Sequence, residues 1–415
     1  MFAIRFPAII IFFIVNILLY FIIKEIYCPK TAFIGVVILN LWPAFSFIGS
    51  IIALPDSPLA LFWLLSVLAF IKIIKSGNKN YWLLFGAAFG FAMLSKYYAV
   101  LICSSAFIFL IFSDKYRYWL TKREPYIALL ISAAIFSPVI IWNALHDWIS
   151  FKYQLYHGIA GNTIGFYDSI IQQISFYNPV FIVALFIVII VLAKELLNSK
   201  NIKAFLDSTT FLVCIFSGLT IILFNVVFIF SKNYHSVVHW AAVGYLLSVP
   251  LIANVINKFL SLKKYNYIWV LSAVPVIFIF NLSPDKILPV GYANIVYKMQ
   301  PQLENVIDGD MFLMTDNQYL ADILSFNFKE IRVLNVEERL SAFDFWQSNL
   351  QQYQSKNAVL VSLNAKMKNG NFFKRAGTDV YRGGILFIKK YSGFEPSKIP
   401  VNYAISYKIK NKKFY

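Results

Sequence analysis

The chain has 415 residues, of which 59% are hydrophobic and only 14% are charged, and its formal net charge is +17. This composition excludes an ordinary soluble domain, because such domains are about 25% charged. The basic residues are spread over many short loops instead of forming one basic face, so the charge does not favour nucleic-acid binding.

Apolar runs of about 17 residues or more recur along the chain, which is the length that a helix needs to cross a bilayer. Lipid offers the backbone no hydrogen-bond partners, so each run is predicted to be helical. The first run is too long for a signal peptide and no small-residue cleavage site follows it. We predict an α-helical polytopic membrane protein with about ten spans, at 5–23, 31–53, 58–74, 80–95, 97–113, 126–145, 169–193, 209–230, 235–256 and 266–283.

Lysine and arginine are distributed unequally between the two alternating sets of loops. One set has only four, at Arg5, Lys96, Lys152 and Lys232. The positive-inside rule assigns the richer set to the cytoplasm, and it places Met1 and the region after the last span outside. The richer set has fifteen, at Lys24, Lys30, Lys72, Lys75, Lys79, Lys115, Arg117, Lys122, Arg123, Lys194, Lys200, Lys203, Lys258, Lys263 and Lys264.

Lys96 interrupts an apolar run at 80–113 that is too long for one span. Ionisable groups near membrane depth are costly and commonly mark a functional site. We predict that Lys96, with its neighbour Tyr97, lies at the outer boundary and binds an anionic group. The alternative is a lysine whose ammonium reaches the lipid headgroups.

Asp56 is held in a stiff outer turn between Pro55 and Pro58. We predict a carboxylate beside an outer cavity, where it pairs with a cation or a substrate hydroxyl. The alternative is that Pro58 is the first residue of the next helix and that Asp56 or Ser57 only caps it.

All four histidines, His146, His157, His235 and His239, also fall in outer segments. His146 lies near three further candidates for sugar binding, which pair aromatic faces with hydrogen-bonding groups: Trp142, Asn143 and Trp148. The alternative is an ordinary aromatic belt at the membrane interface.

His239 precedes Trp240, another pair of the same mixed character, and His235 precedes His239 by four residues. That spacing suits shared metal ligation, but no third ligand is specified nearby. No metal site is therefore assigned, and a divalent metal is left open.

The region from 284 to about 395 alternates short strand-like and helix-like segments, which predicts a small α/β domain with a mostly parallel sheet. The expected strands are 311–316, 331–335, 357–364 and 384–391, and the expected helices are 317–326 and 338–353. Asp316 is the expected cap of the first helix. Residues 1–283 would form the membrane domain and 396–415 a loose basic tail.

Four stretches, in this order, resemble bacterial family-39-type glycosyltransferases: "LPDSPLALFWLLSVLAF", "LLFGAAFGFAMLSKYYAVLI", "SPVIIWNALHDWISFKYQLYHG" and "NYHSVVHWAAVGYLL". That group is related to the aminoarabinose transferase that modifies lipid A and to protein O-mannosyltransferases. The resemblance covers about 5–260, and "FLMTDNQYLADILSFN" extends it weakly into the tail. It implies a GT-C fold with the active site on the outer face.

The resemblance also implies roles for individual residues. Lys96 matches a lysine that would contact the donor phosphate, and Asp56 matches the Asp-x-Pro carboxylate that begins a span. Asn143, His146 and Trp148 match the loop after the sixth span, and His239 with Trp240 matches a His-Trp pair. In the tail, Asn317 and Gln318 replace the basic-aromatic pair that is usual after the aspartate.

Family members begin with a further span and an acidic outer loop that carries the expected catalytic base. This sequence opens where that loop should end, so we expect an N-terminally incomplete chain whose catalytic base is unknown. The implied function is sugar transfer from a polyprenyl-phosphate donor to a lipid, glycan or protein acceptor at the outer face of the bacterial cytoplasmic membrane. The alternatives are an inactive remnant that only binds lipid-linked sugar, and a lipid-linked-sugar transporter.

Overall fold

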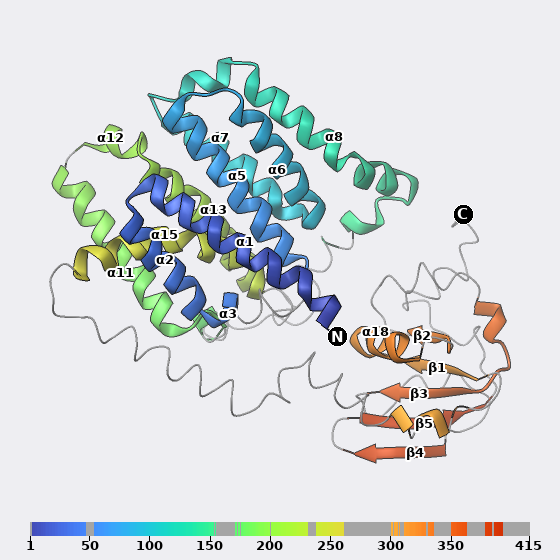
Figure 1. Ribbon diagram of the computed structural model, residues 1–415. Coiled ribbons are helices and arrows are strands. Elements are labelled where there is room, and N and C mark those ends of the chain that lie inside the picture. Colours follow the sequence, from blue (N-terminus) through green and yellow to red (C-terminus); the bar gives the residue numbers. More distant parts are fainter. Residues whose placement is uncertain are drawn as a thin grey trace. The chain divides into compact units, whose positions relative to one another are not determined.

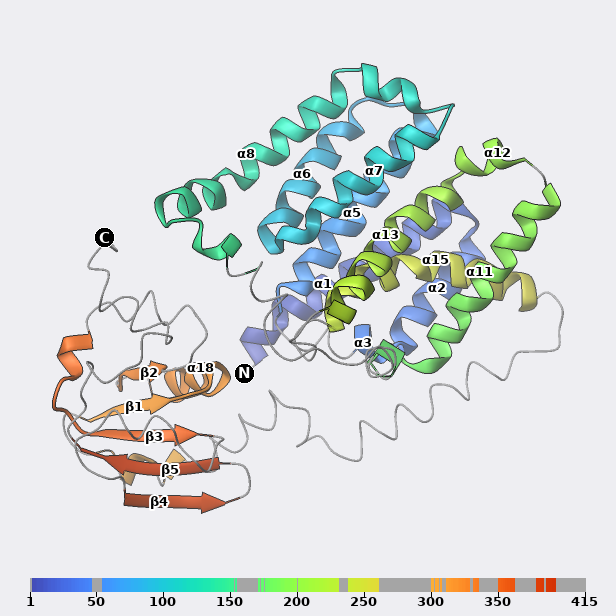
Figure 2. The same ribbon diagram turned by 180° about the vertical axis from the view of Figure 1, so that it is seen from behind.

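In the computed structural model the chain divides into two compact units, Met1–Val276 and Ile277–Tyr415, and each is described by itself (Figures 1 and 2). The structure describes residues 2–46, 54–152, 176–199, 201–230, 238–260, 311–328, 331–335, 350–362, 378–383 and 386–392, with isolated positions between 154 and 174 and between 300 and 307.

The first unit is a bundle of apolar helices. Six of the described helices are long and apolar enough to cross a membrane: Phe6–Ile26, Asp56–Ser76, Glu124–Leu145, Pro179–Asn198, Thr209–Val227 and His239–Lys258. Three shorter apolar helices match three more predicted spans: Pro29–Leu41, Tyr81–Ser95 and Tyr97–Phe112. The polytopic helical class is therefore confirmed. The predicted span 266–283 lies outside the described residues.

The elements of this unit run in the order α1 (Phe2–Ile26), α2 (Pro29–Leu41), α3 (Pro43–Ser46), α5 (Asp56–Ser76), α6 (Tyr81–Ser95), η1 (Tyr97–Ala99), α7 (Val100–Phe112), η2 (Arg117–Thr121), α8 (Glu124–Leu145), α11 (Pro179–Ser199), α12 (Ile202–Leu206), α13 (Thr209–Phe230), η3 (Val238–Ala241) and α15 (Ala242–Leu260).

Two helix boundaries differ from the sequence-based prediction. The predicted span 31–53 is interrupted at Trp42, where the backbone is extended before Pro43. The predicted span 169–193 is interrupted at Asn178, whose φ is +68°: the described residues from 171 to 177 are helical, and α11 begins at the next residue and continues to Ser199. In both places the next residue is a proline, and the residue before a proline is disfavoured in the helical region.

The start of α5 corrects a third expectation. The helix begins at Asp56 and not at Pro58, and its N-cap residue is Pro55, which makes no side-chain cap hydrogen bond. The Asp56 carboxylate does not cap α5, because it is turned to a partner on another helix.

Helix α6 packs against both α5 and α8 (Figure 1). Contact with α8 is close because α6 presents glycine there. A Cβ built on Gly86 would lie 2.4 Å from the carbonyl oxygen of Ala128, and one built on Gly90 would lie 3.0 Å from Cα of Ser132. The small residues of "FGAAFG" thus allow the two helix backbones to approach, as in other membrane bundles.

Aromatic side chains fill much of the space between the remaining helices. Trp42 stacks on Phe181 of α11 with ring centroids 4.2 Å apart, and both rings are buried. Phe70 of α5 contacts Phe109 of α7 and Phe216 of α13 at 5.8 and 5.9 Å. Aromatic contacts therefore connect α5 with α7 and α13 in the core of the bundle.

Ion pairs join the helix ends that the charge count assigns to the cytoplasm. Glu25 of α1 pairs with Lys72 and Lys75 of α5, with N–O distances of 2.5 and 3.8 Å. Glu195 of α11 pairs with Lys258 of α15 at 2.6 Å. Each pair connects two segments predicted on the same side.

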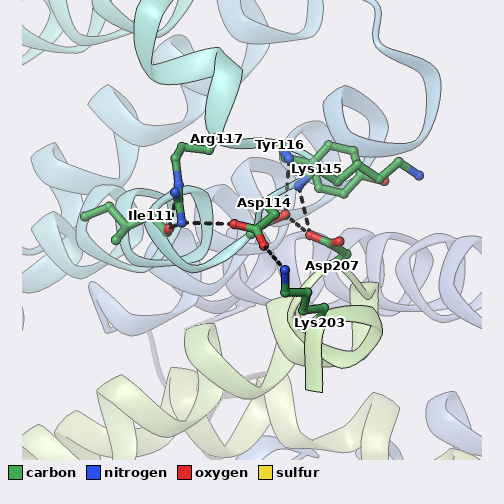
Figure 3. A network of polar contacts seen from close by, with 8 residues as sticks. Ile111, Asp114, Lys115, Tyr116, Arg117, Lys203 and Asp207 are labelled. Atoms are coloured by element: carbon green, nitrogen blue, oxygen red, sulfur yellow. Dashed lines mark hydrogen bonds and ion pairs between the residues drawn. The ribbon is translucent and has the colours of Figure 1, made fainter. Parts of the chain in front are cut away.

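A further polar network connects the α7–α8 loop with the α12 region (Figure 3). Asp114 contacts Arg117 at 3.3 Å and Lys203 at 3.6 Å. Asp207 accepts a hydrogen bond of 2.5 Å from the buried Ser113 hydroxyl. These two loops therefore also lie together, as the alternation of loops requires.

The second unit contains a five-stranded sheet in the order β2-β1-β3-β5-β4. Strand β1 pairs in parallel with β2 and β3, whereas β3 with β5 and β5 with β4 pair antiparallel. The described elements are β1 (Phe312–Thr315), α18 (Gln318–Asn327), β2 (Val333–Asn335), η5 (Leu350–Tyr353), β3 (Ala358–Ser362), β4 (Thr378–Gly383) and β5 (Leu386–Tyr391).

The four predicted strands and the first predicted helix are present, but the sheet is mixed and not mostly parallel. Strand β4 was not predicted, and it pairs with β5 across a short connection, which favours antiparallel pairing. Of the predicted helix 338–353, residues 350–353 form a 3-10 turn and 338–349 lie outside the described residues.

Asp316 is not the cap of α18, as was expected. The cap is Asn317, whose Oδ1 accepts a hydrogen bond of 3.1 Å from the Leu320 backbone N–H. Asp316 instead accepts a hydrogen bond of 2.7 Å from Ser362 Oγ at the end of β3. Burial raises the pKa of Asp316 above its ordinary value of 3.8, and the bond from Ser362 only partly opposes this effect.

This raised pKa predicts that Asp316→Asn stabilises the sheet at neutral pH. The folded state binds the proton more tightly than the unfolded state, so the free energy of unfolding falls as pH rises from 3.8 through the folded-state pKa. Amide hydrogen exchange in β1 and β3 of the full chain should therefore be slower in the variant at pH 7. The difference should vanish below the unfolded-state pKa; faster exchange at pH 7 would contradict the assignment.

Candidate functional site

Lys96 and Asp56 form an ion pair between two helix ends. Lys96 Nζ donates to Asp56 Oδ1 at 2.8 Å across 40 positions of sequence, and the side chains are 19% and 23% exposed. Both groups are therefore largely shielded but reachable. The pair joins the two outer residues that the sequence singled out most strongly.

The backbone around Lys96 explains how the ammonium is presented. Helix α6 ends there, since Lys96 has extended dihedrals (φ −153°, ψ 139°), and η1 begins at the next residue. Lys96 Nζ also lies 5.7 Å from the ring centroid of Tyr98, within the range of a cation–π contact. The predicted break in the 80–113 run is thus confirmed.

An open, mainly apolar groove of about 570 Å³ is lined by residues next to Asp56 and Lys96 in the sequence, although not by Asp56 or Lys96 themselves. Pro55 and Ser57, which flank Asp56, line it together with Ser95, which precedes Lys96. The other walls come from α1, α5 and α6: Pro7, Ala8, Ile11, Leu54, Pro58, Phe62, Phe91 and Leu94.

Tyr97 connects the lysine segment to the chain that follows α8. Its hydroxyl lies 2.8 Å from Ser150 Oγ, and its ring stacks on Phe151 at 4.7 Å. Ser150 in turn donates to Asn143 Oδ1, at 2.6 Å from its hydroxyl and 3.2 Å from its backbone N–H. Two outer segments 53 positions apart are therefore joined through one serine.

Asn143 is fully buried, and its Nδ2 donates to the Val139 carbonyl at 2.9 Å. With its Oδ1 accepting from Ser150, Asn143 is engaged within the protein, so the contacts indicate a positioning residue more than a direct ligand. Substrate contact by Asn143 stays a prediction.

The turn after α8 has an unusual backbone. Asp147 and Trp148 both have positive φ, at 53° and 57°. Non-glycine residues in this region carry strain, which commonly persists at functional sites. His146 stacks on Trp142 with centroids 4.2 Å apart, and Trp148 is 46% exposed. Indole and imidazole faces are thus presented together at the end of α8.

Trp240 reaches the same region through two aromatic contacts. Tyr98 meets Phe224 of α13 edge-on at 4.8 Å, and Phe224 meets Trp240 of η3 edge-on at 5.8 Å. His239 is the preceding residue and is half-buried. The structure therefore gathers the ends of α5, α6, α8, α13 and the start of α15 at one end of the bundle.

His157 and His235 lie outside the described residues. The four-residue spacing of His235 and His239 is therefore not tested by the structure. Among the residues that the structure does describe, no group of three or more His, Cys, Asp or Glu could hold a metal ion.

Sequence reasoning missed three residues that connect the site: Ser150, Tyr98 and Phe224. No sequence motif marks these three residues, because serine and aromatic residues are common throughout this chain. Their importance follows only from contacts between segments that are distant in sequence.

The serine bridge gives a testable expectation. Ser150→Ala removes the hydroxyl donor of the buried Asn143 oxygen but keeps the Ser150 backbone N–H as a donor, so the loss is that of one hydrogen bond, about 0.5–1.5 kcal/mol. We expect lower thermal stability in detergent and greater protease sensitivity of the 143–152 turn. Ser104→Ala is the matched control, because Ser104 only bonds its own helix at the Val100 carbonyl. Equal changes in thermal stability and protease sensitivity for the two variants would contradict the bridging role of Ser150.

Part of the chain matches a known family model. Residues 1–142 match the family model described as dolichyl-phosphate-mannose-protein mannosyltransferase, and this stretch contains Asp56 and Lys96. No curated protein matches the sequence.

The fold is similar to that of ArnT from Cupriavidus metallidurans, both bound to undecaprenyl phosphate (TM-score 0.55) and in the apo state (TM-score 0.53). Each comparison covers 93% of this chain and 83% of that chain at 10% identity. The fold and its membrane helices thus define a GT-C type membrane protein. Residues 1–142 thus resemble a mannosyltransferase family and the fold resembles that of ArnT, in line with the resemblance found in the sequence.

Proposed function

We propose that the chain transfers a sugar from a polyprenyl-phosphate donor to a lipid, glycan or protein acceptor. The observation that carries this proposal is the shielded Lys96–Asp56 pair beside an apolar groove. A lipid phosphate has the same two parts, an anionic head and an apolar chain. The ArnT structure with undecaprenyl phosphate supports a partner of this class.

In this proposal Lys96 binds the donor phosphate. An ammonium group has three donors, and Asp56 accepts from one of them, so others are suited to phosphate oxygens. Negative charge builds on the phosphate as the bond to the anomeric carbon breaks. A preorganised cation in a shielded site stabilises that charge. The Asp56 carboxylate holds the ammonium in place through the 2.8 Å hydrogen bond.

The groove then receives the first part of the lipid chain, because its walls are mostly proline, leucine, isoleucine and phenylalanine side chains. The aromatic groups at the end of α8, which are the exposed Trp142 and Trp148 and the half-buried His146, are suited to the apolar face and hydroxyls of the sugar. His239 and Trp240 are proposed as further contacts of the sugar or the acceptor.

The acceptor hydroxyl or amine needs a general base, usually a carboxylate. Asp56 is engaged by Lys96, so we assign it to orientation and assign no catalytic base among the described residues. Direct displacement by the acceptor at the anomeric carbon would invert its configuration.

Membranes that contain the full chain should transfer labelled sugar from a polyprenyl-phosphate donor to endogenous acceptors. Donor binding without transfer would instead identify a protein that only binds lipid-linked sugar. Movement of intact donor between leaflets without transfer would identify a transporter. Failure to bind the donor at all would overturn the proposal and both alternatives.

We further propose that the protein lies in the bacterial cytoplasmic membrane with Lys96 and the C-terminal unit on the outer side. Alkaline phosphatase fused after residue 392 should be active, and the same enzyme fused within the loop at 77–80 should be inactive. The reverse pattern would place the site on the cytoplasmic side and would contradict sugar transfer at the outer face.

A further inference from the structure

Two asparagines meet on the surface of the membrane unit. Asn40 Nδ2 on α2 donates to Asn16 Oδ1 on α1 at 2.6 Å and to the Val36 carbonyl of its own helix at 2.8 Å. Asn16 Nδ2 donates to the Phe12 carbonyl at 2.8 Å. The two amides form one polar patch on otherwise apolar helices.

The patch lies near the middle of the membrane. Asn16 precedes the end of α1 at Ile26 by ten positions, and Asn40 follows the start of α2 at Pro29 by eleven. With a helix rise of about 1.5 Å per residue, both lie roughly 15 Å from those ends, about half of the hydrocarbon thickness. Water is not available at this depth.

Two polar groups of the asparagine pair remain without a hydrogen bond among the described residues. Within the part of the chain that the structure describes, both N–H groups of Asn40 have acceptors, whereas its Oδ1 has no donor. Asn16 likewise retains one N–H. Polar groups that face hydrocarbon without a hydrogen bond are costly, and Asn40 is exposed on the helix surface.

The side chains around the amides are large and exposed. Phe13 of α1 and Phe33 of α2 are each 66% exposed. Together with the asparagines, the helical positions on this side define what we call the amide face: Ile9, Phe13, Asn16 and Ile17 of α1, and Phe33, Val37, Asn40 and Leu41 of α2.

We propose that the amide face binds the amide face of a second copy of this chain. A twofold axis along the membrane normal keeps every residue at its own depth, and Asn16 and Asn40 share one depth because they touch. In such an isologous interface residue i meets j and j meets i. The spare N–H of Asn16 in each copy then donates to the spare oxygen of Asn40 in the other, and both groups in both copies are satisfied.

The test measures dimerisation of the full chain in lipid. Singly labelled protein is reconstituted at a series of protein-to-lipid ratios, and single-molecule photobleaching gives the dimer dissociation constant. Wild-type protein should show two-step bleaching at the higher ratios. Asn40→Leu should raise the dissociation constant about tenfold, because two symmetry-related interhelical hydrogen bonds are lost.

Ser104→Leu on α7 is the matched control, since it replaces another polar side chain that bonds a carbonyl of its own helix, and Ser104 is not part of the amide face. It should leave the dissociation constant unchanged. A second measurement retains both amides: Phe33→Cys, in a chain with Cys28, Cys103 and Cys214 replaced by serine, should cross-link between copies in membranes.

Single-step bleaching of wild type at every ratio would overturn the proposal. So would an Asn40→Leu dissociation constant equal to that of wild type, or Phe33→Cys protein that cross-links only to a different membrane protein. Equal melting temperatures of wild type and Asn40→Leu in detergent would establish that any loss of dimer is not a loss of folding.

Discussion

Lys96→Ala is expected to lower the rate of sugar transfer by on the order of a hundredfold or more, the cost seen when one preorganised charge-stabilising donor is removed. The lysine is shielded, ion-paired with Asp56 and placed beside the apolar groove, so its charge acts where solvent screening is weak. Because the charge builds mainly in the transition state, kcat should fall more than donor affinity. The measurement is transfer of labelled sugar in membranes over a range of donor concentrations.

The matched control is Lys258→Ala, which removes another lysine that is ion-paired at a helix end, at 2.6 Å from Glu195. Lys258 belongs to the opposite set of loops, which is predicted to be cytoplasmic, so transfer should be unchanged within about twofold, the small cost of an exposed ion pair. Lys96→Arg should retain part of the activity, because it keeps the charge but changes its shape. Unchanged transfer by Lys96→Ala protein would reject Lys96 as the phosphate-binding residue.

Gly86→Ala is expected to destabilise the membrane unit by about 1–3 kcal/mol, the usual cost of overpacking. The added Cβ would lie 2.4 Å from the carbonyl oxygen and 2.7 Å from Cα of Ala128, and backbone atoms of α8 cannot move aside as a flexible side chain can. Helices α6 and α8 must separate, which also disturbs the contacts from Tyr97 to the turn after α8. Thermal unfolding in a single detergent would measure the loss.

Gly218→Ala provides the comparison, because Gly218 also lies inside a helix but its Cβ would meet nothing within 4 Å. The helix-propensity gain of alanine over glycine, about 0.5–1 kcal/mol, applies to both substitutions. Gly218→Ala should therefore be neutral or stabilising. If the two variants unfold at the same temperature, the close backbone contact at Gly86 does not limit the size of the side chain at that position.

The apolar runs predicted most of the helices because hydrocarbon imposes the same requirement on every spanning segment, whatever its neighbours are. The break at Lys96 was also predictable, since a charge within a long apolar run marks a boundary. The starts of α11 and α5 were less predictable. At Asn178 a proline overrides the hydrophobic pattern, and at Asp56 the helix begins before the proline that was expected to begin it.

The site was only partly predictable. Asp56 and Lys96 attract notice as isolated charges, and the resemblance to family-39-type enzymes gave them roles. Asn143 was predicted as a substrate contact, but its side chain is buried and engaged by Ser150. Strand β4 was missed as well, and with it the mixed character of the sheet, because its pairing with β5 is a property of the sheet and not of the segment.

The sequence by itself indicated that this chain spans a membrane, and it predicted which helix ends share a side and which polar residues lie at the outer ends. Hydrophobic length and loop charge act locally, so they can be read along the chain. Only the tertiary structure decided that Lys96 pairs with Asp56, that Tyr97 reaches Asn143 through Ser150, and that Asn16 of α1 meets Asn40 of α2. Those contacts depend on which faces of the helices pack together, and helix packing joins residues tens of positions apart that no local pattern relates.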